Sequence, residues 1–266
     1  MADILTNPYT IMGCTGIIAA GILVYILVRK FPQLAAGMAG CAICAVIGMF
    51  IGAHLLYFIV GLPDFAGNYS NDIYDVQSFL TAFLNASAGM VFYGGLFGAI
   101  LSILICCKAS NLNSRLYLNA LCCAFPMVHA FGRIGCALGG CCYGIEYHGP
   151  FAIQYTEAQI NPGVSDHIAD FPRFPVQVLE AVLELALCAL LFKLFLKFKD
   201  QYALASIYLL IYGIIRFFDE FMRGDTIRGI WGPFSTSQWI SLACIIGAVI
   251  YFCIRRKVLH QHSETM

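Results

Sequence analysis

Long apolar runs, separated by short charged groups and Pro/Gly clusters, dominate the pattern of hydrophobic and polar positions along the chain. A helix needs about 20 apolar residues to cross the hydrocarbon core of a bilayer. Seven runs approach this length: Tyr9–Val28, Leu34–Val60, Ala86–Cys107, Leu116–Leu138, Val176–Leu196, Ala203–Met222 and Gln238–Ile254. The pattern therefore predicts an all-α integral membrane protein with about seven transmembrane helices.

Composition supports lipid as the main solvent. The 266 residues are 60% hydrophobic and 11% charged, whereas soluble domains carry about 25% charged residues. Fifteen basic and fifteen acidic side chains cancel, and no dense basic stretch is present, so nucleic-acid partners are not expected. Only Asp3 is charged ahead of the first run, which lacks the basic start of a cleaved signal peptide and is kept as a span.

The positions of Lys and Arg predict the orientation, because positively charged loops stay cytoplasmic. Ten basic residues follow the first, third, fifth and seventh runs: Arg29, Lys30, Lys108, Arg115, Lys193, Lys197, Lys199, Arg255, Arg256 and Lys257. Only Arg173, Arg223 and Arg228 fall on the other side. We therefore expect an N-terminus outside the cell and a cytoplasmic C-terminus.

Two segments on the expected outer side, residues 61–85 and 143–175, are longer than simple turns. Loops of this size often form functional lids or small caps. No internal repeat or low-complexity tract is apparent. The chain is therefore expected to form a single transmembrane domain over residues 1–266, with these two extracytoplasmic loops.

Ionisable residues inside the spans are the first candidates for function, because each costs roughly 3 kcal/mol on insertion scales. They are His54, His129, Arg133, Glu180, Glu184, Arg216, Asp219 and Glu220, with Arg223 at a span end. His129 and Arg133 are four residues apart and share a helix face, and the glycines after them let a headgroup phosphate approach. This pattern indicates an anion site, although glycine-mediated packing beside a snorkelling arginine is the alternative.

A second group of charges follows one helical stripe. Arg216, Glu220 and Arg223 stand at i, i+4 and i+7, so Glu220 is expected to hold both guanidiniums. A structural ion-pair stripe between helices is the alternative. Glu180 is expected one turn inside a helix that begins after Pro175.

Glycines and cysteines supply weaker patterns. Gly94 and Gly98 have the spacing of close helix packing. The spacing of Cys136, Cys141 and Cys142 does not match structural zinc, so no metal is expected, even with His129 or His148 as a further ligand. A disulfide from Cys136 to Cys141 or Cys142 is the alternative, whereas a vicinal Cys141–Cys142 bond is strained.

Together and in this order, these segments resemble the bacterial prolipoprotein diacylglyceryl transferase family. The resemblance covers nearly the whole chain. Its carriers are the segment from Gly52 to Tyr57, Tyr93-Gly94-Gly95-Leu96, Gly132-Arg133-Ile134-Gly135 with its continuation to Gly144, Pro175-x-Gln177-x-x-Glu180, and Tyr212-Gly213-x-x-Arg216-x-x-x-Glu220-x-x-Arg223.

The resemblance implies a concrete reaction in the bacterial plasma (inner) membrane, with no cofactor. Such enzymes move the diacylglyceryl group of phosphatidylglycerol to the lipobox cysteine thiol of a preprolipoprotein signal peptide and release glycerol 1-phosphate. Arg133 and Arg216 would bind the phosphate, and Glu220 and Arg223 would hold Arg216. Tyr212 would donate a hydrogen bond. The phospholipid site would include Gly94, Gly95 and Gly135, and Glu180 would support it.

This chain departs from the family pattern at four positions. Tyr93 replaces a histidine, Cys136 an asparagine, Cys141 an acidic residue and His54 an arginine. Tyr93 is therefore expected to donate a hydrogen bond to the lipid, and His129 is the leading general base, because an imidazole titrates near pH 6.5.

Other assignments remain open at this point. His54 is the second candidate for the base, and unaided formation of the acceptor thiolate is the alternative to either. The competing functions are a divergent paralogue that transfers a lipid-derived group to another acceptor, and a non-enzymatic lipid-binding membrane protein.

Overall fold

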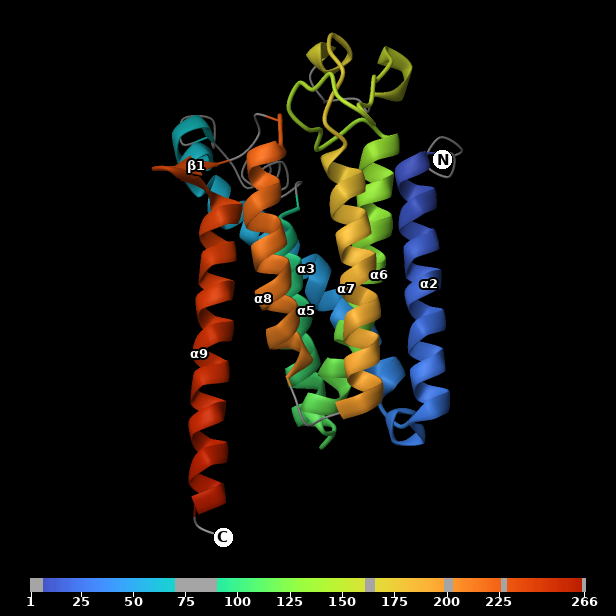
Figure 1. Ribbon diagram of the computed structural model, residues 1–266, viewed down its shortest axis with the longest axis vertical. Coiled ribbons are helices and arrows are strands. Elements are labelled where there is room, and N and C mark those ends of the chain that lie inside the picture. The colour runs from blue at the N-terminus through green and yellow to red at the C-terminus, as the bar shows by residue number, and fades with distance from the viewer. Residues whose placement is uncertain (1–6, 70–89, 161–165, 199–202, 226–228, 265–266) are drawn as a thin grey trace. The chain divides into compact units, whose positions relative to one another are not determined.

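The computed structural model describes residues 7–69, 90–160, 166–198, 203–225 and 229–264. Seven α-helices lie within these residues: α2 (Pro8–Lys30), α3 (Met38–Tyr69), α5 (Phe92–Ala109), α6 (Ser114–Leu138), α7 (Val176–Phe198), α8 (Leu204–Asp219) and α9 (Thr236–Glu264) (Figure 1). Each of the seven predicted runs overlaps one of these helices. A short antiparallel hairpin, β1 (Ile230–Trp231) with β2 (Phe234–Ser235), precedes α9 and was not predicted.

Five of these helices are long and apolar enough to cross a membrane: α2, α3, α5, α6 and α9. α7 carries Glu180, Glu184 and Lys193 along its length, and α8 has 16 residues before a 3-10 turn. Large apolar side chains are exposed on the outer faces of the helices, with Ile17 and Ile18 of α2 each more than 60% exposed. Such faces are typical of helices that contact lipid. The described residues thus form an α-helical membrane protein.

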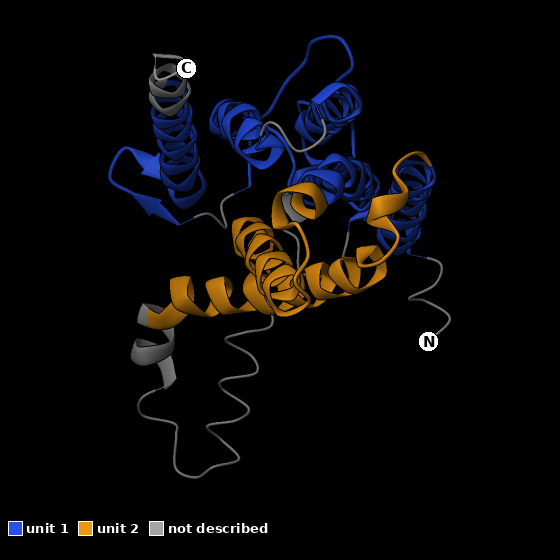
Figure 2. Ribbon diagram, turned by 90° about the horizontal axis from the view of Figure 1, so that it is seen from below, with its two compact units in different colours: residues 1–29, 119–266 blue, residues 30–118 orange. Residues whose placement is uncertain are grey.

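Two compact units make up the chain: residues 30–118, and residues 1–29 with 119–266 (Figure 2). In the first unit, α3 packs on α5 through glycines. A Cβ at Gly98 would overlap the Gly48 carbonyl oxygen, and one at Gly94 would overlap that of Gly52. The small-residue packing predicted for Gly94 and Gly98 is therefore confirmed.

The second unit is built around α6, α7 and α8, with α2 and α9 beside them. Gly16 of α2 faces Phe131 of α6, and Gly213 of α8 faces the Ser241 backbone of α9. The buried Asn119 side chain of α6 accepts a hydrogen bond from the Leu204 N–H at the start of α8, at 2.9 Å. This bond satisfies one of the donors that a helix start leaves unpaired.

The segment between α6 and α7 forms a small cap. It includes the 3-10 helices η2 (Glu157–Gln159) and η3 (Asp166–Ala169), and isolated bridges pair Arg173 with Glu146 and with Ile153. Tyr143, Tyr155 and Ile168 form its own apolar cluster. The cap's expected position outside the cell stays a prediction.

Several predicted boundaries are wrong. α3 continues through Pro63 to Tyr69, so the loop expected from Gly61 begins later, and residues 70–85 of it lie outside the described residues. Membrane helices tolerate proline where neighbouring groups satisfy the freed backbone. α5 begins at Phe92 rather than at Ala86. Val91 is extended and donates its N–H to the Ala53 carbonyl instead of continuing a helix.

Candidate functional site

Five buried charged side chains gather where α6, α7 and α8 pack in the second unit. They are Arg133 on α6, Glu180 and Glu184 on α7, and Arg216 and Asp219 on α8, none of them more than 9% exposed. Helical periodicity explains the gathering, because each helix turns one polar stripe toward its neighbours and the rest of its surface is apolar. We call this group the charged cluster.

Glu180 is the centre of the charged cluster. Its Oε2 forms an ion pair with the Arg133 guanidinium, and its Oε1 lies 3.6 Å from Nε2 of His129 and accepts a 3.4 Å hydrogen bond from the Tyr212 hydroxyl. The Asp219 carboxyl lies within electrostatic range of Glu180 as well. Glu180 lies one turn inside α7, whose first residue follows Pro175, as predicted.

His129 is held between two carboxyl groups. Its Nδ1 lies 3.1 Å from Glu184 Oε1, while its Nε2 faces Glu180. The imidazole also makes an edge contact with the Tyr212 ring at 5.3 Å, and Tyr212 stacks on Tyr208. His129 and Arg133 therefore share one face of α6, as their spacing predicted, and that face meets α7.

Arg216 has its own carboxyl partner. It forms an ion pair with Glu220, four residues later, and its Nη2 lies 3.4 Å from the Ser237 hydroxyl of α9. The prediction that Arg223 continues the same helical stripe is wrong, because α8 ends at Asp219 and residues 220–222 form a 3-10 turn, η4. Arg223 is extended, and its Nε donates to Asp225 at 2.8 Å while its Nη2 contacts the second oxygen.

Both arginines have a buried N–H group that no other described residue binds. Arg133 Nε and Arg216 Nη1 have no hydrogen-bond partner within the described ranges. Glu180 and Asp219 each lie within electrostatic range of both guanidiniums. Since buried guanidinium N–H groups are rarely left unpaired, this arrangement offers two donors to an anion beside the same pair of carboxyl groups.

The remaining predicted site residues are divided between the two units. Tyr93, Gly94, Gly95 and His54 belong to the unit of residues 30–118, so a role for them beside Arg133 stays a prediction. Tyr93 is buried and stacks on Phe97, and Gly94 and Gly95 face α3.

Gly135 lies within the second unit. A Cβ there would lie 3.1 Å from the Tyr9 ring of α2, which gives this glycine a packing reason. Its contact with phospholipid stays a prediction.

Gln177 was not predicted as a site residue in its own right. Its amide donates to the Cys141 carbonyl at 2.9 Å and to the Tyr155 hydroxyl at 3.1 Å, and so joins the start of α7 to the cap. Burial raises the pKa of Tyr155 to about 12, which keeps this hydroxyl neutral. Its position as a polar residue at the start of an apolar run is the feature of the sequence that could have indicated this role.

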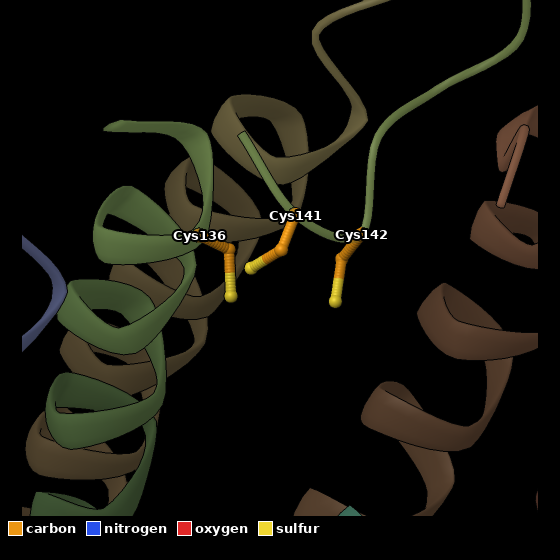
Figure 3. Close-up of side chains that lie close together, drawn as sticks. All are labelled: Cys136, Cys141 and Cys142. Atoms are coloured by element: carbon orange, nitrogen blue, oxygen red, sulfur yellow. The ribbon is translucent and has the colours of Figure 1, made fainter. Parts of the chain in front are cut away.

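Three thiols meet where α6 ends. The Sγ atoms of Cys136, Cys141 and Cys142 lie within 4.8 Å of one another, and Figure 3 shows Cys141 pointing toward Cys136. All three are free thiols. Hydrogen bonds from the Cys136 and Cys141 thiols, together with the Arg133 and Arg223 guanidiniums, hold the pKa of Cys142 well below its usual range.

The fold and the charged cluster define a class: an α-helical membrane protein with a buried arginine–carboxyl group suited to an anionic ligand. The chain belongs to the prolipoprotein diacylglyceryl transferase family, whose model matches residues 3–254.

Named relatives cover most of the chain. A phosphatidylglycerol–prolipoprotein diacylglyceryl transferase of Clostridium tetani is 32% identical over 248 residues, which are 93% of this chain and 92% of the relative. Phosphatidylglycerol–prolipoprotein diacylglyceryl transferase 2 of Clostridium perfringens is 31% identical, over 80% of this chain and 77% of the relative. The relative from Gloeobacter violaceus is 25% identical, over 96% of this chain and 91% of the relative.

Proposed function

We propose that this protein transfers the diacylglyceryl group of phosphatidylglycerol to the lipobox cysteine of a preprolipoprotein in the bacterial inner membrane. Family membership and the names of the relatives support this activity. The observation that carries it is the pair of buried arginines, Arg133 and Arg216. Each has a donor with no partner among the residues that the structure describes, beside the same two carboxyl groups.

The reaction is a displacement at carbon. The acceptor thiol loses its proton, its sulfur forms a C–S bond to the glyceryl carbon, and the C–O bond to phosphate breaks, so that glycerol 1-phosphate leaves with the bonding electrons. Negative charge collects on the phosphate as this bond breaks. Two oriented guanidiniums in a site shielded from water stabilise that charge more than they stabilise the bound lipid.

The carboxyl groups set the direction of the arginines. Glu180 holds Arg133 and Glu220 holds Arg216, so each planar guanidinium keeps its remaining N–H groups aimed at one place. Tyr212 binds Glu180 and adds a hydroxyl near the phosphate. The role of Arg223 is to shape the chain after α8, where it binds Asp225.

His129 is the proposed general base, with His54 as the second candidate. Glu184 orients the imidazole through Nδ1, which leaves Nε2 on the side of Glu180 and Tyr212 to take the thiol proton. Tyr93 donates a hydrogen bond to an ester or headgroup oxygen. Contact of the lipid with Gly94, Gly95 and Gly135 stays a prediction, because these glycines pack closely on neighbouring helices.

Transfer in a defined system tests this function. Purified protein in detergent is mixed with phosphatidylglycerol and a lipobox peptide, and the expected products are the thioether-modified peptide and glycerol 1-phosphate. A peptide with serine in place of the lipobox cysteine is the control. Binding of phosphatidylglycerol with no release of glycerol 1-phosphate would favour a lipid-binding protein, and release without peptide modification would favour a paralogue with another acceptor.

A further inference from the structure

The thiol cluster of Cys136, Cys141 and Cys142 is distinct in chemistry from the charged cluster. Cys136 lies in the last turns of α6, and its carbonyl accepts a 3.1 Å hydrogen bond from the Cys141 N–H, which closes a tight turn. Gly140 and Cys142 both have positive φ, at 64° and 54°. This backbone brings Cys141 and Cys142 back toward the end of α6 (Figure 3).

The convergence of three sulfurs matches the geometry of a metal site. An ion bound about 2.3 Å from each of three thiolates holds these sulfurs about 4 Å apart. The Sγ atoms already lie within 4.8 Å of one another, so small side-chain rotations bring them to that spacing. Among the residues that the structure describes, no histidine or carboxylate joins this group.

We propose that Cys136, Cys141 and Cys142 bind a soft, thiophilic metal ion through three sulfur ligands, with monovalent copper as the ion. Hard cations such as Mg²⁺ and Ca²⁺ take oxygen ligands. Structural zinc takes four ligands, whereas three thiols meet here among the described residues, and Cu(I) is a soft ion that thiolates bind well. Binding releases the thiol protons to solvent as the metal–sulfur bonds form. This site does not depend on the transferase activity.

A disulfide is the competing use of these thiols. It would consume two sulfurs and leave the third unused, and the vicinal pair, Cys141 with Cys142, closes only with strain. The position of all three thiols on one side of the turn favours a ligand that uses the three together.

Competition for copper tests the proposal directly. The full-length protein, purified in detergent under anaerobic reducing conditions, is titrated with Cu(I) against a coloured Cu(I) chelator. We expect the protein to bind one equivalent of Cu(I) tightly. Cys141→Ser or Cys142→Ser is expected to weaken this binding at least about tenfold, since loss of a residue that only hydrogen-bonds to a metal ligand already changes the affinity by that factor.

Two matched controls separate this site from the other cysteines. Cys14→Ser removes an exposed thiol. A double variant, Cys41→Ser with Cys107→Ser, removes a separate thiol pair whose sulfurs are 3.6 Å apart. Both controls are expected to keep the tight equivalent. Its loss in the double variant, with retention in Cys141→Ser, would overturn the proposal.

Alkylation of the unaltered protein is a second test, and it does not depend on whether a variant folds. Cu(I) is expected to protect Cys136, Cys141 and Cys142, and to leave the exposed Cys14 and Cys253 reactive, when alkylated cysteines are mapped by mass spectrometry. Equal alkylation with and without Cu(I) contradicts the proposal. So does a Cys136–Cys141 disulfide in the protein as isolated, or tighter binding of Zn²⁺ with a fourth, lighter ligand in X-ray absorption spectra.

Discussion

Arg216 is the side chain on which the proposed reaction depends most. Its guanidinium binds Glu220 and Ser237 and keeps one further N–H group unpaired within the described ranges. A lysine ammonium cannot reproduce this planar set of donors. We therefore expect Arg216→Lys to lower the rate of diacylglyceryl transfer by about 10²-fold or more, as loss of an oriented donor to a developing anion does.

Arg223→Lys is the matched control for this prediction, because Arg223 binds Asp225 beyond the end of α8. It is expected to cost clearly less in the same assay with phosphatidylglycerol and a lipobox peptide. Near-normal turnover by Arg216→Lys, with the protein folded and present in equal amount, would remove Arg216 from the phosphate site.

His129 gives a second prediction at this scale. His129→Gln keeps a hydrogen bond to Glu184 but takes up no proton at neutral pH, so turnover is expected to fall by roughly 10²-fold and the acid limb of the pH–rate profile to flatten. His148→Gln, on the exposed surface of the cap, is the control. If His129→Gln leaves both rate and pH profile unchanged, the base is sought at His54 or Tyr93.

At the scale of elements, the packing of α3 on α5 rests on glycines. Gly98→Ala places a Cβ against the Gly48 carbonyl oxygen, and because backbone atoms cannot move aside cheaply, we expect a loss of stability of about 1–3 kcal/mol. Gly40→Ala, at a position with open space, is the control and is expected to be neutral or stabilising. Thermal unfolding in detergent measures both; equal midpoints would contradict this packing.

The lengths of apolar runs predicted where helices lie better than where they end. Pro63 and Gly61 suggested a loop, but α3 passes through both, since a membrane helix can satisfy its backbone locally. The i+4 spacing of His129 and Arg133 was enough to predict a shared face. The same spacing could not predict their partners on α7. Glu180 and Glu184 reach α6 only through tertiary packing, which a single sequence does not reveal.

The thiol cluster shows the same limit. The spacing of the three cysteines differs from that of zinc motifs, so no metal site was expected from the sequence. In the structure, a turn with positive φ at Gly140 and Cys142 brings Cys141 and Cys142 to Cys136. Backbone conformation, rather than the number of intervening residues, decides which cysteines meet.

For the whole molecule, the orientation in the membrane is the first prediction. The predicted seven spans, with ten basic residues on one side, favour a cytoplasmic C-terminus. A green fluorescent protein fused to the C-terminus is therefore expected to fluoresce, and alkaline phosphatase fused there to be inactive. Phosphatase fused within residues 143–175 is expected to be active. The reverse pattern would contradict both the span count and the proposed position of the cap outside the cell.

Complementation tests the central claim most directly. A bacterial strain depleted of its own prolipoprotein diacylglyceryl transferase is supplied with this chain, with Arg216→Lys, or with an empty vector. We predict that the unaltered chain restores growth and lipid-modified lipoproteins, and that Arg216→Lys, present at the same level in the membrane, does not. Correctly inserted, well-expressed wild-type protein that leaves lipoproteins unmodified would contradict the account.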